Sequence, residues 1–582
     1  MNLKQQSAKF SGRGDSCAIR RLLIVLLCLN SATAFAQAAP GAGEILQTVP
    51  PAVVRPDSGP SIDDSLSKSK AVADVEGMQL EINGFRVTGL TVASEAEMTG
   101  ALAAFVGPNK RFQDLLDAAA AVKRELAGRG YFLADVIVPE QKISDGVVEL
   151  RVLEGRLGKV RLEVDADAPI SRALLESYIG SLEEGELIRT GDVERALFQI
   201  HDLRGIVASS SFAPGATAGT ADLTIKVRAG KKFDANLDFD ANGSIYTGLH
   251  RVGGGVDGNG LFGYGELINL RASNAIDGNL RFARASALVP VGPWGSKVGV
   301  AYSELKYRLG TPLFSGLKAN GSAVVESFIG IHPIVRSRNA NLLAILQADK
   351  RKFEDIRLTT NIDTRKISDV NSLALSGDFR DRLGGGGINV FNVAYTLGEI
   401  KYAPPTAGAD RTNERIFSKT NLTLARLQSL PAISDRLAFY GAFSQQFTNK
   451  NLDASEKFSL GGPNGVRAYP QGEGSGDEGY FANLELRYRL PLEDNLPGTL
   501  VLAGFYDFGR SILIKKPTLA DLTSATPTPL RERIAGPGIG LNWEVPNDWY
   551  LRTTLAFRDT GKATADHLLR YPRFYFQFSK FF

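Results

Sequence analysis

The chain contains almost no cysteine. Only Cys17 and Cys28 occur among its 582 residues, and both lie in a basic and then apolar N-terminal segment that includes the run Leu22 to Leu29. Ala34-Phe35-Ala36 forms a small-x-small cleavage site, so residues 1–36 are predicted to be a secretory signal peptide. The mature chain is then free of cysteine. A large exported protein without disulfides is typical of a bacterial envelope, because small extracellular scaffolds usually depend on them.

Long hydrophobic runs and a charge excess are also missing. After Leu29, no stretch approaches the roughly twenty apolar residues that a membrane-spanning helix needs, so any bilayer crossing must be made by strands. Of the 67 Lys and Arg residues, five precede Leu22, as does one of the 63 Asp and Glu residues. The mature chain therefore carries equal numbers of both signs, and nothing indicates a nucleic-acid partner.

Residue patterns for catalysis or metal binding are weak. The histidines have no paired spacing and no thiols accompany them, which argues against a metal site: they are His201, His250, His332 and His567. Gly253 to Gly258 matches G-x-G-x-x-G, but no helix follows, so a dinucleotide site is not expected. Gly472 to Gly476 lacks the serine of a nucleophile elbow, and we interpret Asp477 and Glu478 as solvated loop charges. We predict no enzyme activity, no metal and no cofactor.

Residues 37–76 are predicted to be an extended linker that contains one short helix. The helix, Ala42 to Val49, is amphipathic through Ile45, Leu46 and Val49, and the remainder is rich in proline. A helix this short is marginal alone. It either occupies a cavity that holds it or is a frayed leader.

Two segments, 77–156 and 157–231, repeat the element order β-α-α-β-β. In the second, the helical spacing of Leu175, Ile179, Leu197 and Ile200 indicates core packing. Each segment is long enough for a small α+β domain with helices packed on a three-stranded sheet. The open edges of such sheets can accept an extended peptide as a further strand.

From residue 232 to residue 582 the pattern changes to about sixteen alternating segments separated by turns, the even number expected of a single-chain outer-membrane barrel. Tyr480 to Leu490 and Leu500 to Gly509 are clear examples. A soluble β-sandwich or a solenoid is the alternative. A sandwich would need helices or a second sheet to cover its apolar face, and only similar strands follow here. The predicted fold is two α+β domains followed by an all-β, sixteen-stranded antiparallel transmembrane barrel.

A Gly-rich loop, Leu460 to Gly479, carries the lone cation Arg467. Asp507 lies among small residues on one face of the predicted strand Leu500 to Gly509. If the loop folds back against that face, Arg467 and Asp507 form a charge-assisted pair. Otherwise the loop is a mobile surface segment with an unpaired arginine, and patterning alone does not decide between the two.

The order of these parts resembles the outer-membrane transporters of two-partner secretion, which export filamentous haemagglutinins and haemolysins through a POTRA-bearing barrel. The loop motif Val466, Arg467, Ala468 and Tyr469, and the strand residues Phe505, Asp507 and Gly509, carry the resemblance. The family usually has Gly where Ala468 stands, which leaves the backbone angle at that position open. The resemblance implies that the loop tucks inside the barrel, that Arg467 pairs with Asp507, and that Ala42 to Val49 begins a plug helix.

The resemblance also implies a function. Two POTRA-like domains in the periplasm hold an unfolded exoprotein, such as an adhesin, haemolysin or contact-dependent toxin, by its N-terminal secretion domain. The barrel, a monomer in the outer-membrane lipid of a Gram-negative bacterium, passes that chain outward without ATP. Two alternatives stay open: an assembly factor that inserts barrel proteins, which is expected to have more POTRA repeats, and a passive porin, which has no use for periplasmic domains.

Overall fold

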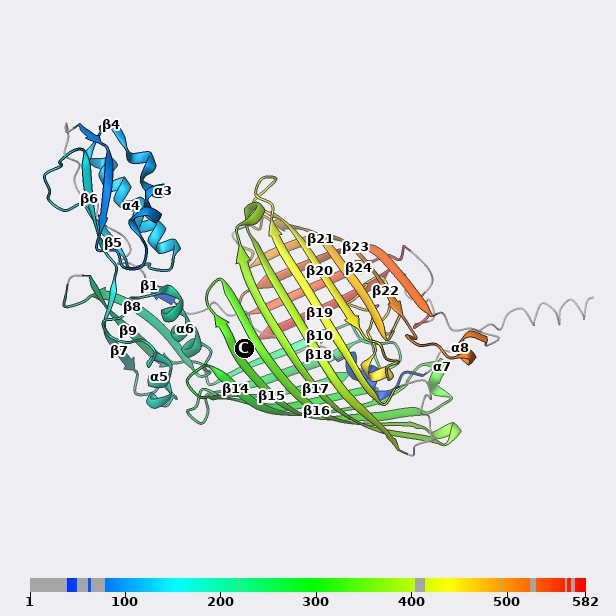
Figure 1. Cartoon of the computed structure of the whole chain (residues 1–582). Coiled ribbons are helices and arrows are strands. Elements are labelled where there is room, and N and C mark those ends of the chain that lie inside the picture. The colour runs from blue at the N-terminus through cyan, green and yellow to red at the C-terminus, as the bar shows by residue number, and fades with distance from the viewer. Residues whose placement is uncertain are drawn as a thin grey trace, which may run out of the picture. The chain divides into compact units, whose positions relative to one another are not determined.

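The computed structural model describes residues 39–49, 61–63, 79–217, 219–403, 414–493, 495–523, 530–559, 563–566 and 571–582. The predicted signal peptide, 1–36, lies outside this part of the chain. The described residues form two small α/β units and a closed barrel (Figure 1). None of the described helices is both long and apolar enough to cross a membrane.

The first α/β unit consists of two small sheets and two principal helices. Its elements are β2 Leu80–Ile82, β3 Gly84–Thr88, α3 Glu95–Leu102, η2 Ala103–Phe105, β4 Gly107–Lys110, α4 Phe112–Gly128, β5 Asp135–Ile137 and β6 Val147–Leu153. Strands pair in the order β3-β6-β5, and β2 pairs with β4. Met98 of α3, Val122 of α4 and Leu150 of β6 form its buried core, which fixes the helices to one side of the sheet.

The second α/β unit has the predicted helices and strands and one strand more. Its elements are β7 Arg156–Val164, α5 Arg172–Ile179, α6 Thr190–His201, β8 Ile206–Pro214 and β9 Thr220–Ala229. Leu175, Leu197 and Ile200 lie in its core and Ile179 packs against it, as predicted. The extra strand is β1, Ser61–Asp63, which pairs with β8, so the sheet order is β1-β8-β9-β7.

Strand β1 corrects the prediction that everything after the short helix in 37–76 is extended linker. The short helix itself is present as α2, Ala42–Gln47, and ends at Thr48. Three residues are too few to show a periodicity in the sequence, and β1 exists because an unpaired neighbouring strand supplies its partner.

Sixteen antiparallel strands of the described chain close a barrel in which β10 pairs with β25. They are β10 Phe233–Asp240, β11 Arg251–Asn259, β12 Leu267–Ala275, β13 Leu280–Val291, β14 Ser296–Arg308, β15 Ala319–Arg336, β16 Ala340–Arg357, β17 Ile362–Asp381, β18 Gly387–Ala403, β19 Ile416–Ser429, β20 Leu437–Phe447, β21 Glu478–Leu490, β22 Thr499–Ile512, β23 Arg531–Val545, β24 Trp549–Ala556 and β25 Arg573–Phe581. The predicted fold class is confirmed.

Outward-facing side chains define an apolar band with a charged rim. On β17, which has 20 residues, Leu373 and Leu375 are exposed on the outer surface, whereas Asp369 and Arg365 occupy the same face nearer its start. A tilted strand needs only about 9 to 11 residues to cross a bilayer. The long strands therefore extend beyond the membrane, and the polar alternation that remains faces the lumen.

Candidate functional site

The connection between β20 and β21, residues 448–477, is here named the lumenal loop, and most of its residues are buried. Its charged side chains pair with five different strands: Glu456 with Arg351 of β16 and Lys419 of β19, Asp453 with Lys366 of β17, and Arg467 with Asp507 of β22 and Glu485 of β21. These strands lie on opposite parts of the ring. A single loop can contact all of them only if it lies inside the barrel. The predicted tucked loop is therefore present, and the surface-loop alternative is wrong.

Arg467 is fixed to the wall by several contacts at once. Its backbone N–H and its Nε both donate to Oδ2 of Asp507, at 3.0 and 2.8 Å, and its Nη2 donates to Oδ1 at 2.8 Å. Nη1 pairs with Glu485 of β21 at 2.7 Å. The guanidinium lies 3.5 Å from the ring centroid of Phe505. This combination of bidentate pairing and ring stacking is specific to arginine, since lysine has neither the fork nor the plane.

The alternation of β22 explains why these groups meet. Phe505, Asp507 and Gly509 are i, i+2 and i+4, so all three face the lumen, and all three are buried. At Gly509 an added Cβ would lie 2.6 Å from Cδ1 of Leu460. Glycine leaves room there for the Leu460 side chain of the lumenal loop and for the carbonyl of Tyr480 on β21, which would lie 2.7 Å from the added Cβ.

Ala468 adopts an ordinary backbone conformation. It is absent from the described residues with positive φ, so no glycine is required, and the question raised by the sequence is resolved. Its Cβ faces Gly536 of β23, where an added Cβ would come within 2.6 Å. Alanine fits in the loop because the wall opposite is a glycine.

The remaining motif residues lie in the same cluster. Val466 and Tyr469 are fully buried beside Phe505, and the carbonyl of Tyr469 accepts a 3.0 Å hydrogen bond from the hydroxyl of Tyr575 on β25. All seven predicted site residues are thus brought together. Burial acts to lower the pKa of the Arg467 guanidinium, but its bonds to Asp507 and Glu485 outweigh burial and raise that pKa. Arg467 therefore stays charged although it is largely buried.

Sequence reasoning missed three polar residues of the site. Glu485 is one of several charges that alternate along β21 and carries no distinguishing signal in the sequence. The same holds for Asn483, which donates to Asp507 and to the carbonyl of Gly465. Glu473 accepts hydrogen bonds from the backbone N–H groups of Thr564 and Ala565. The interpretation of Asp477 as a solvated charge is wrong: it is fully buried and pairs with Lys457.

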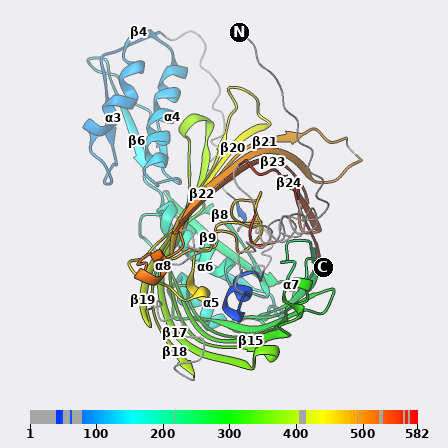
Figure 2. The same cartoon turned by 90° about the vertical axis from the view of Figure 1, so that its right-hand side faces the viewer.

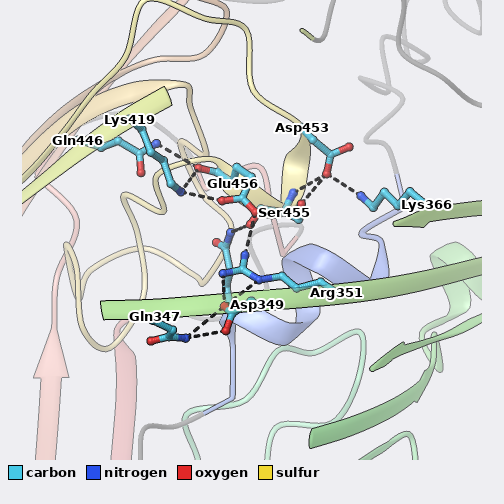
Figure 3. A network of polar contacts seen from close by, with 10 residues as sticks. Gln347, Asp349, Arg351, Lys366, Lys419, Gln446, Asp453, Ser455 and Glu456 are labelled. Carbon is cyan, nitrogen blue, oxygen red and sulfur yellow. Dashed lines mark hydrogen bonds and ion pairs between the residues drawn. The ribbon is translucent and has the colours of Figure 1, made fainter. Parts of the chain in front are cut away.

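A second anchor of the lumenal loop is the short helix η5, Ala454–Glu456. Figure 3 shows Asp453 pointing toward Lys366 and Glu456 pointing toward Lys419 and Arg351. The Asp453 and Glu456 side chains are under 10 % exposed. Charges this far from water persist only when paired, so breaking one pair leaves a costly unpaired charge.

Helix α2 lies against this anchor inside the ring of strands, as the blue helix in Figure 2 shows. The N–H of Ala42 donates to Oδ1 of Asp355 at 2.7 Å, and Nη1 of Arg251 donates to the carbonyl of Thr48 at 2.8 Å. Nε2 of Gln47 donates to the carbonyl of Ser455 at 2.7 Å. The wall thereby satisfies one orphan backbone group at each end of the helix, which helps to hold these six residues in a helix.

A closed sixteen-stranded barrel, α/β domains ahead of it, and an arginine loop and a helix held in the lumen define a class of outer-membrane transporter. The sequence matches the profile described as "Haemolysin secretion/activation protein ShlB/FhaC/HecB" over residues 219–541, more than half of the chain. Residues 80–155 match "POTRA domain, ShlB-type". The chain belongs to the ShlB/FhaC/HecB family of two-partner secretion transporters.

Individual relatives agree with this assignment. The chain is 27% identical over 430 residues to the "Heme/hemopexin transporter protein HuxB" of Haemophilus influenzae strain 86-028NP, covering 71% of this chain and 72% of that protein. It is 21% identical to the "Outer membrane transporter CdiB" of Dickeya dadantii strain 3937, covering 73% and 76%. The solved structure of CdiB from Escherichia coli superposes with a TM-score of 0.62 at 20% identity, covering 99% of this chain and 100% of that one.

Family membership confirms the predicted outer-membrane location, with the N-terminal POTRA part in the periplasm. Members of the family are transporters of a secreted partner protein, in agreement with the prediction of transport.

Proposed function

We propose that this transporter captures an unfolded exoprotein in the periplasm and passes it through the barrel lumen to the cell surface without ATP. In this proposal residues 77–156 and 157–231 are two POTRA-like domains that hold the N-terminal secretion domain of the exoprotein. Residues 232–582 form the conduit, as a monomer, and 37–76 supply the plug and its linker. The exoprotein is a large adhesin, haemolysin or contact-dependent toxin.

The observation that supports a conduit is how the lumen is filled. Both α2 and the lumenal loop are attached to the wall by discrete ion pairs and hydrogen bonds, such as Arg467 with Asp507 and Ala42 with Asp355. Beside α2 a cavity of about 720 Å³ remains, lined by apolar wall residues such as Phe282 and by polar ones such as Arg271 and Ser303. Occupants held by a few polar contacts can leave without unfolding the barrel, because the wall is closed by its own strand ladder.

The site residues have a positional role in this proposal. Arg467, with Asp507 and Phe505, fixes the lumenal loop against β22, while Val466, Ala468, Tyr469 and Gly509 provide the close packing that lets the loop reach the wall. The loop then guides or gates the passing chain. No nucleotide site is needed, since folding of the exoprotein outside the cell prevents it from sliding back.

Deletion of Gln79 to Arg228 tests the proposal. We expect secretion of the exoprotein to be abolished, while a folded, heat-modifiable barrel remains in the outer membrane at wild-type abundance. The exoprotein is identified as the protein lost from the culture medium when the transporter is deleted. Secretion that continues at the wild-type level without these residues would show that the POTRA domains do not capture it.

A further inference from the structure

The two ends of the lumenal loop lie side by side, and Asp477 joins them. Oδ1 of Asp477 accepts a 3.0 Å hydrogen bond from the backbone N–H of Leu452, which lies 25 residues earlier, near the other end of the loop. Next to this contact, Phe458 and Gly476 exchange backbone hydrogen bonds of 2.7 and 3.0 Å. The lumenal loop is therefore closed on itself as a stem, and Arg467 lies beyond the stem.

The second oxygen of Asp477 joins the loop to a different part of the chain. Oδ2 accepts a 2.8 Å hydrogen bond from the backbone N–H of Lys515, in the connection between β22 and β23. Nζ of Lys457 lies 3.0 Å from Oδ1 of Asp477 and also donates to the carbonyl of Leu513 in that connection, at 2.7 Å. Three segments far apart in the sequence thus meet at one carboxylate. The junction of Asp477 with Leu452, Lys457 and Lys515 is here named the base clasp.

Neighbouring contacts support the base clasp. The side-chain amide of Asn451 donates to the carbonyl of Lys516 at 2.8 Å and accepts from the N–H of the same residue at 2.7 Å. Leu452 is fully buried in a cluster with wall residues of β17, β18 and β19. The Asp477 side chain has no exposed surface. A carboxylate so far from water persists only when it is paired and hydrogen-bonded, so the clasp depends on all of its donors.

The base clasp lies at the outer end of the barrel. Strand β10 follows the second α/β unit, so it begins at the periplasmic end, and each even-numbered strand of the barrel runs outward. The connections that follow β20 and β22 therefore lie on the outer side. Asp507 precedes Ile512, the last residue of β22, by five residues. Arg467 is thus held deeper in the lumen than the clasp.

We propose that Asp477 is a positioning residue that holds the base of the lumenal loop, so that the loop stays in the lumen when the Arg467–Asp507 pair is broken. The loop then has two separate attachments. Loss of the deeper one lets the loop swing away from the wall as one body, because the stem bonds do not involve Arg467. The base clasp keeps that body from leaving through the outer mouth of the barrel. The inference rests on the proposed role of the loop in guiding the exoprotein.

Chemical labelling of intact cells that lack the exoprotein tests the inference in the full-length transporter. The mature chain is expected to lack cysteine, so Asn464→Cys introduces a single thiol on the loop, at an exposed position that lines a lumenal cavity. The probe is a maleimide joined to a polymer too large to enter the filled lumen, added outside the cells. Its rate of reaction per folded, heat-modifiable barrel measures how often the loop leaves the lumen.

In the Asn464→Cys protein, Arg467→Ala should leave the labelling rate close to that of the parent, because the base clasp remains. Adding Asp477→Ala should raise the rate several-fold, since both attachments are then lost. Asp477→Asn in the same background should be intermediate, because the amide oxygen accepts from only one of the two N–H groups. If the alanine variant does not fold, the asparagine variant decides by the same comparison. Equal rates with and without the Asp477 change would overturn the inference.

Asp521→Ala is the matched control. Asp521 is also in the connection between β22 and β23, where it accepts hydrogen bonds from Thr518 of the same connection. Added to Arg467→Ala, it should leave the labelling rate unchanged, and a rise as large as that caused by Asp477→Ala would also overturn the inference. Because no exoprotein is present, the result is independent of capture. If the clasp fails this test while deletion of Gln79 to Arg228 abolishes secretion, the proposed function stands and only the role of Asp477 fails.

Discussion

Arg467 joins the lumenal loop to the barrel wall through a buried ion pair, a second carboxylate and an aromatic ring. Asp507 is fully buried and the Arg467 side chain is only 14% exposed. Removing one member of a buried, hydrogen-bonded pair leaves the other charge without a counter-ion, at a cost of about 3–5 kcal/mol. This cost is avoided when the loop leaves the wall and the remaining charge becomes hydrated.

We therefore expect Arg467→Ala and Asp507→Ala each to reduce secretion strongly without lowering barrel abundance. Because both act on one interaction, the double variant should be no more impaired than the worse single variant. Arg467→Lys should be intermediate, since lysine keeps the charge and loses the bidentate geometry. The measurement is exoprotein in the medium per folded barrel in the outer membrane.

Arg510→Ala is the matched control, because Arg510 is an exposed arginine on the same strand as Asp507. It should secrete normally. If the effects of the Arg467 and Asp507 changes add as independent lesions, the two residues are not functional partners and the loop is held by other contacts.

The sequence predicted the Arg467–Asp507 pair through the resemblance, and the alternation of β22 placed Phe505 and Gly509 on the same face. It did not predict Glu485. Glu485, Arg487 and Arg489 alternate in the same way along β21, and nothing local distinguishes the carboxylate that meets the loop from its charged neighbours. That information resides in the tertiary position of the loop.

Helix α2 is an element that depends on its surroundings. With six residues it is far shorter than the roughly 12 residues at which isolated helices become stable. Its stability comes from contacts with β14, β15, β16 and η5, and from caps such as the bond from the N–H of Gly41 to Glu44. A helix held in this way is released when a few contacts are lost.

Gly43 is the point of closest approach between α2 and the lumenal loop, where an added Cβ would lie 2.4 Å from Cβ of Ser455. We expect Gly43→Val to displace the helix and to raise the conductance of the barrel in planar bilayers, as deletion of residues 42–49 should. Gly316→Val is the control, because Gly316 has φ of −62° and open space around its Cβ position. Wild-type conductance in both the Gly43 variant and the deletion would show that α2 is not the obstruction.

Glu44 makes docking of α2 dependent on pH. Burial raises its pKa above the ordinary 4.5; the Gly41 bond and Lys366 act against this, whereas Asp453 and Asp355 add to it. A raised pKa in the docked state means that docking is strongest below the ordinary value and weakens as pH rises through the raised value. Conductance should therefore increase with pH in that range. The Glu44→Gln variant, which cannot ionise, should show no such increase, and an unchanged slope in this variant would contradict the assignment.

Strands of the barrel were predictable because their alternation continues for many residues. The short strands were not. Strand β4, with the sequence GPNK, has turn-forming residues and no alternation, and β1 has three residues. Both form only because an existing strand supplies a partner, so tertiary pairing overrides local propensity.

At the scale of the whole molecule, the barrel lumen is the proposed route of the exoprotein. Along each barrel strand, alternate side chains face the lumen and the outer surface. On β14, Ser303 is 5% exposed and lines the cavity beside α2, whereas Tyr302 is 48% exposed on the outer surface. Because Ser303 and Tyr302 are adjacent on one strand, probes at these two positions sample the inside and the outside of the barrel at the same height.

The most direct test places a photo-crosslinking amino acid at Ser303 or at Tyr302 in cells that are secreting the exoprotein. If the lumen is the route, we expect crosslinks between the transporter and the exoprotein from position 303 and none from position 302. We also expect the crosslinks from position 303 to disappear when Gln79 to Arg228 is deleted. Crosslinks from Tyr302 with none from Ser303 would contradict it, because the exoprotein would then travel along the outside of the barrel.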